Sequence, residues 1–313
     1  MTVTQKAYYS DYGDNRMEKY EVNGGIEESC QASSVCCFIH KNKLKIVKDL
    51  WGEHIGIKKA VATLAQKKEK YFEDKKGKFG KNQKYGNQPC AGLGTGFLIT
   101  HNKVMTAKHV ITAMRLQKIS KFRAVFGYEM IDKDKVDTIP QESICRIKRI
   151  VASSTLGGED WAICELAERP IYSFPVRLNL DYKIEEDDMV SMWGHPSGLP
   201  IKYVPRGIVM PNKDAKEHIL TGSEKVHTYQ LKIAAFHGNS GSPIFKDNKV
   251  VGILIAGRSD YELCDRFIKR WCRPPLMIKE IRTHLVSNEE IENYGYEVAQ
   301  RIDSIKEFIE PLL

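Results

Sequence analysis

The sequence lacks any run of about eighteen apolar residues, the length that a membrane-spanning helix requires. Residues 1–25 have no apolar central region and no small-residue cleavage site, so they do not match a secretion signal. Both absences argue against the membrane and secreted classes. We therefore predict a cytoplasmic protein without a membrane partner.

The sequence also lacks the paired cysteine spacing of a zinc site and the cysteine density of a small disulfide scaffold. Several cysteines lie in apolar runs such as SVCCFI and DWAICEL, where cysteine acts as a small buried hydrophobe. We predict that most are free thiols and that the protein needs no metal and no cofactor. The cysteines are Cys30, Cys36, Cys37, Cys90, Cys145, Cys164, Cys264 and Cys272.

Positive charge is not concentrated enough for a dedicated nucleic-acid binder. Lys and Arg exceed Asp and Glu by 48 to 40, a formal net charge of +8 over 313 residues. Residues 67–84 contain eight lysines, and we interpret this segment as an exposed loop or hairpin. A nucleic-acid patch there is the less favoured alternative, so we predict no specific nucleic-acid partner.

Short β-rich runs separated by turn residues recur from about residue 90 to residue 258, without helical stretches between them. This series favours an all-β barrel or sandwich over a parallel α/β sheet, and the chain length favours two barrels. The runs are GTGFLIT, KVMTA, RAVFGYEM, CRIKRIVAS, DWAICEL, DMVSMWG, TYQLKIAA, SPIF and KVVGILIAG.

The chain changes character after residue 275. LMIKEIRTHL has helical spacing, and S-N-E-E at Ser287 matches a capping box that would begin a second helix. Further on, four apolar residues fall on one helical face, so we predict that this helix docks on a barrel. They are Val298, Ile302, Ile305 and Ile309.

Two segments place a histidine and a carboxylate at strand ends. In GTGFLITHNKVMTAKHVITA, two strands joined by a turn would present His109 just beyond the second strand. In GEDWAICELAERP, Asp160 stands at the mouth of an apolar strand, where a buried carboxylate needs a partner such as an imidazole. Glu159 is the alternative acid, but neighbouring strand residues face opposite ways.

The segment GNSGSP combines a serine with glycines that leave the backbone accessible. Gly238 would let backbone amides converge on a small anion, and Ser240 follows two residues later. The amides of Gly238 and Ser240 would then form an oxyanion hole. Gly241 lets the chain turn away without shielding the serine hydroxyl, and Ser242, next to Pro243, is structural.

In the order His, Asp, Ser, these motifs resemble the trypsin-like serine proteases of the chymotrypsin fold. GNSGSP resembles the nucleophile motif in the variant of bacterial glutamyl endopeptidases and related peptidases. WGHPSGLP and KVVGILIAG are similar to a turn and to the cleft strand of bacterial members. Over residues 55 to 272, the resemblance implies a mainly β fold of two six-stranded antiparallel barrels, and the catalytic residues His109, Asp160 and Ser240.

The predicted organisation has four parts. Residues 1–54 are an N-terminal extension partly docked on the barrels, and residues 55–175 are the first barrel, with His109 and Asp160. Residues 176–273 are the second barrel, with Ser240, and residues 274–313 form C-terminal helices.

Asn239 departs from the pattern of secreted trypsins. Those proteins carry an aspartate there, which pairs with a new N-terminus after cleavage, and a neutral amide cannot form that ion pair. The cysteines that flank the histidine loop of secreted animal members are also missing. We therefore do not expect activation by propeptide cleavage. The missing cysteines agree with a reducing compartment.

The resemblance assigns substrate binding to Ala234, Ala235, His237, Leu254, Ala256 and Gly257. For His237 the favoured alternative is an exposed loop histidine. An uncharged pocket would favour an apolar or small P1 side chain, because a buried substrate charge without a partner is costly. Asp260 at the rim is the alternative and would favour a basic residue. Leu254 stands where glutamyl endopeptidases carry a histidine, which argues against glutamate specificity.

The sequence thus predicts an intracellular serine endopeptidase whose partners are protein or peptide substrates. The alternative is a protease-like scaffold that binds partners without cleaving them. A cytoplasmic protease has to be restrained, so the N-terminal segment, the lysine-rich segment and the helical tail are candidates for controlling the cleft. A regulatory protein partner belongs to the same hypothesis.

Overall fold

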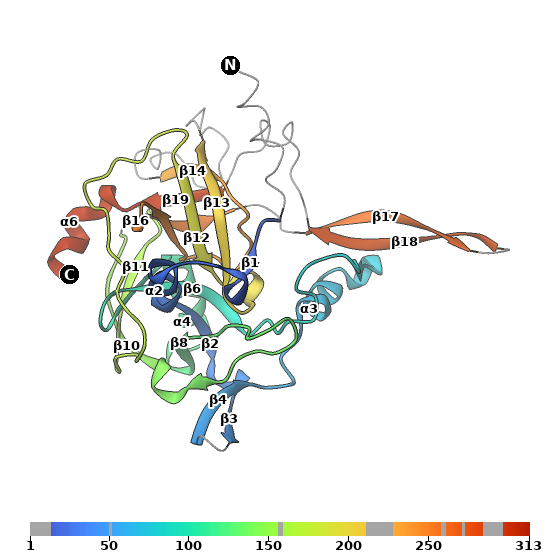
Figure 1. The fold of residues 1–313 in the computed structure, drawn as a ribbon, viewed down its shortest axis with the longest axis horizontal. Coiled ribbons are helices and arrows are strands. Elements are labelled where there is room, and N and C mark those ends of the chain that lie inside the picture. Colours follow the sequence, from blue (N-terminus) through green and yellow to red (C-terminus); the bar gives the residue numbers. More distant parts are fainter. Residues whose placement is uncertain are drawn as a thin grey trace.

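The computed structural model describes residues 14–49, 52–155, 159–210, 228–257, 261–270, 273–283 and 297–313. Two closed antiparallel barrels make up its body (Figure 1). The first closes in the order β10-β11-β7-β6-β2-β8. Its strands are β2 (Val35–His40), β6 (Gly92–Thr100), β7 (Lys103–Thr106), β8 (Phe122–Phe126), β10 (Ile144–Ser153) and β11 (Ala162–Leu166).

The second barrel follows the order β13-β12-β15-β16-β19-β14 and is closed by the pairing of β13 with β14. Its strands are β12 (Met189–Gly194), β13 (Lys202–Met210), β14 (Thr228–Lys232), β15 (Pro243–Lys246), β16 (Lys249–Ala256) and β19 (Glu297–Arg301). The predicted mainly β fold of two six-stranded barrels is confirmed. All nine β-rich runs of the sequence supply barrel strands, and β2, β13 and β19 complete the two rings.

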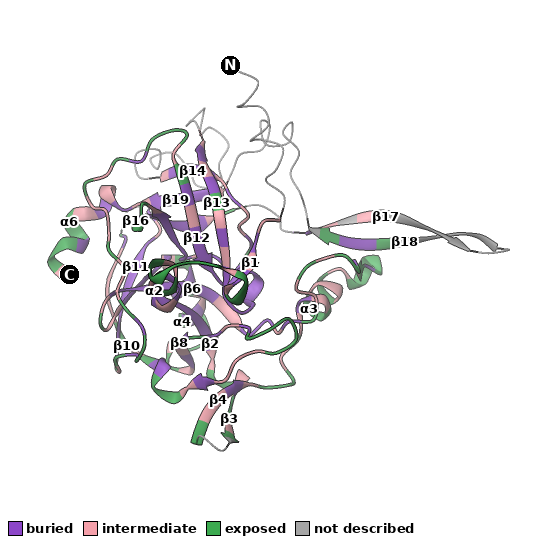
Figure 2. Ribbon diagram, viewed as in Figure 1, coloured by how far each residue is buried: buried purple, intermediate pink, exposed green. Residues whose placement is uncertain are grey.

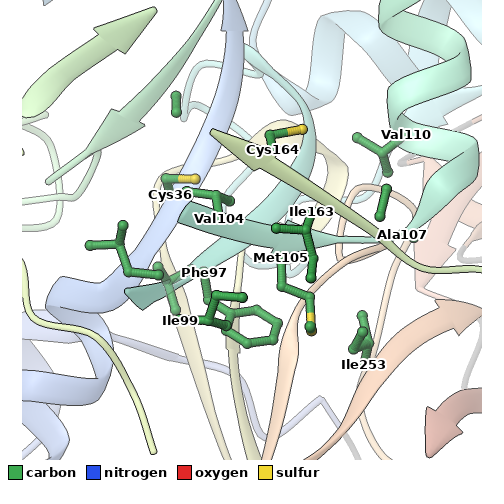
Figure 3. Packing of buried hydrophobic residues seen from close by; sticks show 14 of the residues in the cluster. Cys36, Phe97, Ile99, Val104, Met105, Ala107, Val110, Ile163, Cys164 and Ile253 are labelled. Atoms are coloured by element: carbon green, nitrogen blue, oxygen red, sulfur yellow. The ribbon is translucent and has the colours of Figure 1, made fainter. Parts of the chain in front are cut away.

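Apolar side chains fill the interior of the first barrel and continue into the second. Phe97 of β6 and Ile163 of β11 both lie opposite Met105 of β7, and all three side chains are buried (Figure 3). The same core cluster reaches Ile253 of β16. Burial follows the barrel walls, whereas the projecting helices and loops are largely exposed (Figure 2). Continuous packing therefore holds the junction between the barrels.

The predicted C-terminal helical segment 274–313 is wrong over most of its described length. Arg273–Thr283 is strand β18, which forms a projecting hairpin with β17 (Tyr261–Arg270) (Figure 1). Glu297–Arg301 is β19, so the second barrel extends beyond residue 273. The predicted helix start at Ser287 lies outside the described residues. Strand β19 pairs with β14 on one side and with β16 on the other, which completes the ring of backbone hydrogen bonds. This tertiary gain outweighs local helical periodicity.

The end of the chain nevertheless docks on a barrel, although Val298 of the predicted helical face belongs to strand β19. A 3-10 turn (Asp303–Ile305), α6 (Lys306–Ile309) and a second 3-10 turn (Glu310–Leu312) end the chain. Ile302, Ile305 and Ile309 are fully buried in the core cluster of the first barrel. The chain thus leaves the second barrel and packs against the first.

The N-terminal region also departs from the predicted boundaries. The predicted extension 1–54 contains β2, which lies between β6 and β8, so the first barrel begins before residue 55. Before it, β1 (Met17–Glu18) pairs with β13, and α2 (Ile26–Ser34) leads into β2. Strands β3 (Leu44–Asp49), β4 (Gly52–Ile57) and β9 (Ile139–Pro140) form a small separate sheet.

Two helices occur where the sequence pattern predicted none. The lysine-rich segment 67–84 is helical at its start rather than a loop or hairpin throughout, because α3 (Leu64–Tyr71) begins at a capping box between Thr63 and Gln66. A 3-10 turn (Glu73–Lys75) and the short strand β5 (Lys78–Phe79) follow, and β5 pairs with β18. In the first barrel, α4 (Lys108–Leu116) separates β7 from β8. Among the described residues, no helix is long and apolar enough to cross a membrane.

Candidate active site

His109 and Asp160 are in direct contact. His109 lies in the first turn of α4, where its Nδ1 is 2.5 Å from Asp160 Oδ2. Its backbone amide donates to the other carboxylate oxygen at 2.9 Å. The imidazole is about half exposed, at 47 %, whereas the carboxylate is 19 % exposed. A carboxylate acceptor makes Nδ1 the protonated nitrogen, so Nε2 faces outward as a proton acceptor.

Strand pairing brings these two residues together. Ala162 of β11 lies opposite Thr106 of β7, so the start of β11 and the end of β7 meet at one edge of the barrel. Asp160 lies two residues before the first residue of β11, and His109 follows β7. The Asp160 amide also donates to Gln300 Oε1 of β19 at 3.2 Å. The sequence analysis missed Gln300 because it assigned this segment to a helix.

Glu159, the alternative acid, has another partner. Its side chain is buried and accepts a hydrogen bond from the Trp161 indole N–H at 3.2 Å. The structure therefore directs Asp160, rather than Glu159, toward the imidazole.

The turn at residues 236–242 leaves two backbone amides unused. Gly238 has φ +102° and Gly241 has φ +89°, a left-handed region that favours glycine. Within the described part of the chain, no carbonyl accepts from the amides of Gly238 and Ser240. The backbone hydrogen bonds of the turn run from Asn239 N to Phe236 O at 2.9 Å, from Gly241 N to Leu254 O at 2.7 Å and from Ser242 N to Asn239 O at 2.8 Å.

Thr95 of β6 joins this turn to the first barrel, and the sequence analysis did not single it out as a functional residue. Its amide donates to the Ser240 carbonyl at 2.9 Å, and its hydroxyl donates to the Gly238 carbonyl at 2.8 Å. A side chain at Gly241 would collide with Thr95 O and Thr106 Oγ1. The backbone beside Ser240 therefore lies against the end of β7, close to where His109 begins its helix turn.

Ser240 itself is partly exposed. Its hydroxyl forms no hydrogen bond with the His109 ring in this structure, in which both residues are described. Such catalytic hydrogen bonds are often long until a substrate complex forms. The structure thus brings the predicted nucleophile to the barrel junction that carries the imidazole and the carboxylate.

The predicted substrate-binding residues have different surroundings. Ala234 and Ala235 are half-buried beside the core of the second barrel, and His237 is exposed. Leu254 is buried in that core, so it supports the turn rather than offering a free surface.

A carboxylate lies at one end of this predicted pocket. Ala256 is half-buried, and a side chain built at the neighbouring Gly257 would collide with the carboxylate of Glu297 in β19. The prediction of an uncharged pocket did not include this acid, because it placed the segment outside the barrel. Asp260, the other acid considered, lies outside the described residues.

His195 forms part of the support beneath Gly238. A side chain at Gly238 would meet the His195 carbonyl and the amides of Ser197 and Gly198. The His195 ring is 1 % exposed, stacks on Tyr128 and has Nδ1 3.0 Å from the Leu199 carbonyl. Burial lowers the pKa of His195 to about 3.

The protein should therefore lose stability in acid through His195. Below its unfolded pKa of about 6.5, the imidazole takes up a proton only in the unfolded chain, so the free energy of unfolding falls as the pH falls toward 3. The full effect of this one group is roughly 5 kcal/mol. Urea unfolding between pH 7 and pH 4 measures it.

The variant His195→Asn isolates this contribution, because the Asn amide can donate in place of Nδ1. We expect the free energy of unfolding of this variant to fall less steeply with decreasing pH than that of the wild type. The matched variant His101→Asn changes an exposed residue and should keep the wild-type slope. An unchanged slope in His195→Asn would contradict the assignment.

Metal-binding side chains are not clustered at this site. Across the described residues, no group of three or more His, Cys, Asp or Glu could hold a metal ion. The chemistry available here is that of a serine hydroxyl, an imidazole, a carboxylate and two backbone amides.

Comparison with known proteins identifies the family. The Trypsin family model matches residues 79–265. The chain is 27% identical over 160 residues to "Putative protease Do-like 3, mitochondrial" of Arabidopsis thaliana, a match over 51% of this chain and 25% of that protein. It therefore spans about a quarter of the length of this relative.

A solved structure shows the same fold. The VesB protease of Vibrio cholerae superposes with a TM-score of 0.51 at 11% identity, over 94% of this chain and 66% of that chain. The scabies mite inactivated protease paralogue S-I1 has a TM-score of 0.49 at 12% identity, over 91% of this chain and 95% of that chain. Because the Trypsin model matches more than half of the 313 residues, the chain belongs to the trypsin family, with its chymotrypsin-like fold.

Proposed function

We propose that the chain is a serine endopeptidase that hydrolyses peptide bonds with His109, Asp160 and Ser240. The observation that carries this proposal is the contact between His109 Nδ1 and Asp160 Oδ2, which orients the ring and leaves Nε2 as a base. Membership of the trypsin family supports the same reaction class.

The reaction would proceed in two halves. Ser240 Oγ attacks the scissile carbonyl carbon while its proton passes to His109 Nε2, and Asp160 stabilises the imidazolium. The oxyanion accepts hydrogen bonds from the amides of Gly238 and Ser240, which no backbone carbonyl uses within the described turn. His109 then protonates the leaving amine, and water hydrolyses the acyl-enzyme by the same route in reverse.

A fluorophosphonate tests the nucleophile directly. It forms a covalent bond with an activated serine, so mass spectrometry of the wild-type protein should find one adduct, on Ser240. The matched variant Ser242→Ala should label equally well. A wild-type protein that never labels, even at high reagent concentration, would favour the non-cleaving scaffold.

We also propose that the enzyme acts inside the cell and belongs to the bacterial branch related to glutamyl endopeptidases. The described cysteines are free thiols, and burial raises the pKa of Cys36, Cys37 and Cys145 above the ordinary thiol value. Unreactive, unpaired thiols fit a reducing compartment. The neutral Asn239 supports this branch, because it replaces the aspartate of secreted trypsins.

A further inference from the structure

A buried cluster of charges lies where the N-terminal arm, defined here as residues 14–18, meets the second barrel. Strand β1 pairs with β13, so that Glu18 lies opposite Lys202. The residues Arg16, Glu18 and Lys202 are each at most 2 % exposed. Burying three charges is costly unless each has a partner, so this cluster needs an explanation.

Glu18 and Lys202 form a buried ion pair. Lys202 Nζ is 3.0 Å from Glu18 Oε2, and the Gln88 amide donates to Glu18 Oε1 at 2.6 Å. Lys202 also lies over the Tyr85 ring, at 4.7 Å from its centroid. These contacts fasten the arm to the barrel.

Arg16 connects the arm to the candidate active site. Its guanidinium donates to both oxygens of Asp14, each at 2.6 Å, which fixes its plane. The guanidinium carbon lies 3.6 Å from the centroid of the Phe236 ring, a close cation–π stack. The Tyr85 hydroxyl donates to the Arg16 carbonyl at 2.7 Å and holds the backbone in place.

Phe236 is the first residue of the turn that carries Gly238 and Ser240. Its carbonyl accepts from the Asn239 amide at 2.9 Å, which closes the turn around Gly238. Its ring is buried and contacts Tyr261 as well as Arg16, with the Tyr261 ring centroid 5.8 Å away. A buried ring with two such contacts limits the rotation of the backbone that follows it.

We propose that Arg16 is a positioning residue that orders the turn 236–242 through the Phe236 ring, so that the Gly238 and Ser240 amides stay aligned. Its consequence for catalysis rests on the proposed function. The side chain at position 239 is neutral and, among the described residues, has no hydrogen-bond partner. The Thr95 hydrogen bonds to Gly238 and Ser240 therefore share the ordering of this turn with the Phe236 ring, and Arg16, a cation inside the folded chain, contacts that ring.

Hydrogen–deuterium exchange of the full-length protein tests the coupling without any enzymatic readout. In Arg16→Met, the peptide that contains residues 236–242 should exchange about tenfold to thirtyfold faster, since a desolvated cation–π contact is lost. The matched control is Arg301→Met, because Arg301 forms the same kind of local pair with Asp303, at 2.8 and 3.0 Å, but contacts no aromatic ring of the turn. It should leave the exchange of this peptide unchanged.

Kinetics give the second readout. Because the amides act on the transition state, Arg16→Met should lower kcat by about tenfold and change KM little. Phe236→Leu should have a similar effect, and the double variant should be no slower than the worse single variant, since both remove one contact. Arg16→Lys keeps the positive charge but lacks the planar guanidinium, so its kcat should lie between those of the wild type and Arg16→Met.

The outcomes separate the two proposals. An active wild type whose exchange and kcat are unchanged in Arg16→Met would overturn the role of Arg16 and leave the protease assignment intact. A wild type that neither labels nor cleaves, with exchange still accelerated in Arg16→Met, would overturn the function and keep the coupling. If Arg16→Met does not fold, Arg16→Lys and Phe236→Leu decide, and multiplicative losses in their double variant would count against a shared contact.

Discussion

Ser240→Ala should lower kcat for peptide hydrolysis by about a million-fold, the loss seen when a triad nucleophile is removed. The hydroxyl is the only atom lost, and no hydrogen bond of the described structure depends on it. The Ser240 carbonyl keeps its bond from the Thr95 amide, so the turn and the fold should survive. Single-turnover kinetics on a quenched peptide, together with thermal unfolding, measure both effects.

Ser242→Ala is the matched control for this experiment. Its hydroxyl is fully buried and has no hydrogen-bond partner in the described part of the chain. Removing an unsatisfied polar atom is neutral or stabilising, so the variant should keep the wild-type rate. A Ser240→Ala protein that cleaves as fast as the wild type, or a Ser242→Ala protein that is inactive, would mean that the nucleophile is assigned wrongly.

Asp160→Asn should lower kcat by about ten-thousand-fold. The Asn carbonyl can still accept from the His109 amide, but its NH₂ group would face Nδ1 and donate to it. The imidazole then carries its proton on Nε2, where the Ser240 proton has to be accepted, so the ring is in the wrong tautomer. Steady-state kinetics from pH 6 to pH 10 measure the loss.

Glu159→Gln controls for the neighbouring acid. Because Glu159 contacts the Trp161 indole, its amide variant should retain near wild-type kcat. A large loss in Glu159→Gln with little change in Asp160→Asn would reverse the assignment of the acid. Comparable losses in both would indicate damage to the strand start rather than to proton transfer.

The contact between His109 and Asp160 and the form of the turn around Ser240 could be predicted because short motifs carry local geometry. Few residues other than glycine adopt the left-handed backbone found at Gly238 and Gly241, so glycines beside a serine indicate a tight turn around it. The position of Asp160 before an apolar strand likewise indicates a partly buried carboxylate that needs a partner. The structure places Asp160 against His109, as its position next to the strand suggested.

The supporting residues could not be predicted, since their roles depend on contacts between distant segments. Thr95 and Gln300 act through hydrogen bonds to Gly238 and Asp160, and neither has a local motif that names a partner. The carboxylate of Glu297 meets Gly257 only because β19 enters the second barrel. Arg16 belongs to a segment with no apolar periodicity that would mark it as buried.

Local patterns in the chain were thus sufficient for the β class, the two barrels, the order of the three motifs and the free cysteines. These features depend on short-range alternation and on residue chemistry, which the chain carries at each position. Only the tertiary structure decided three other features. These are the strands β2 and β19 that close the barrels, the helices α3 and α4, and the position of the N-terminal arm on the second barrel. Barrel closure and the pairing of buried charges are long-range terms, and they override weak local propensity wherever the two disagree.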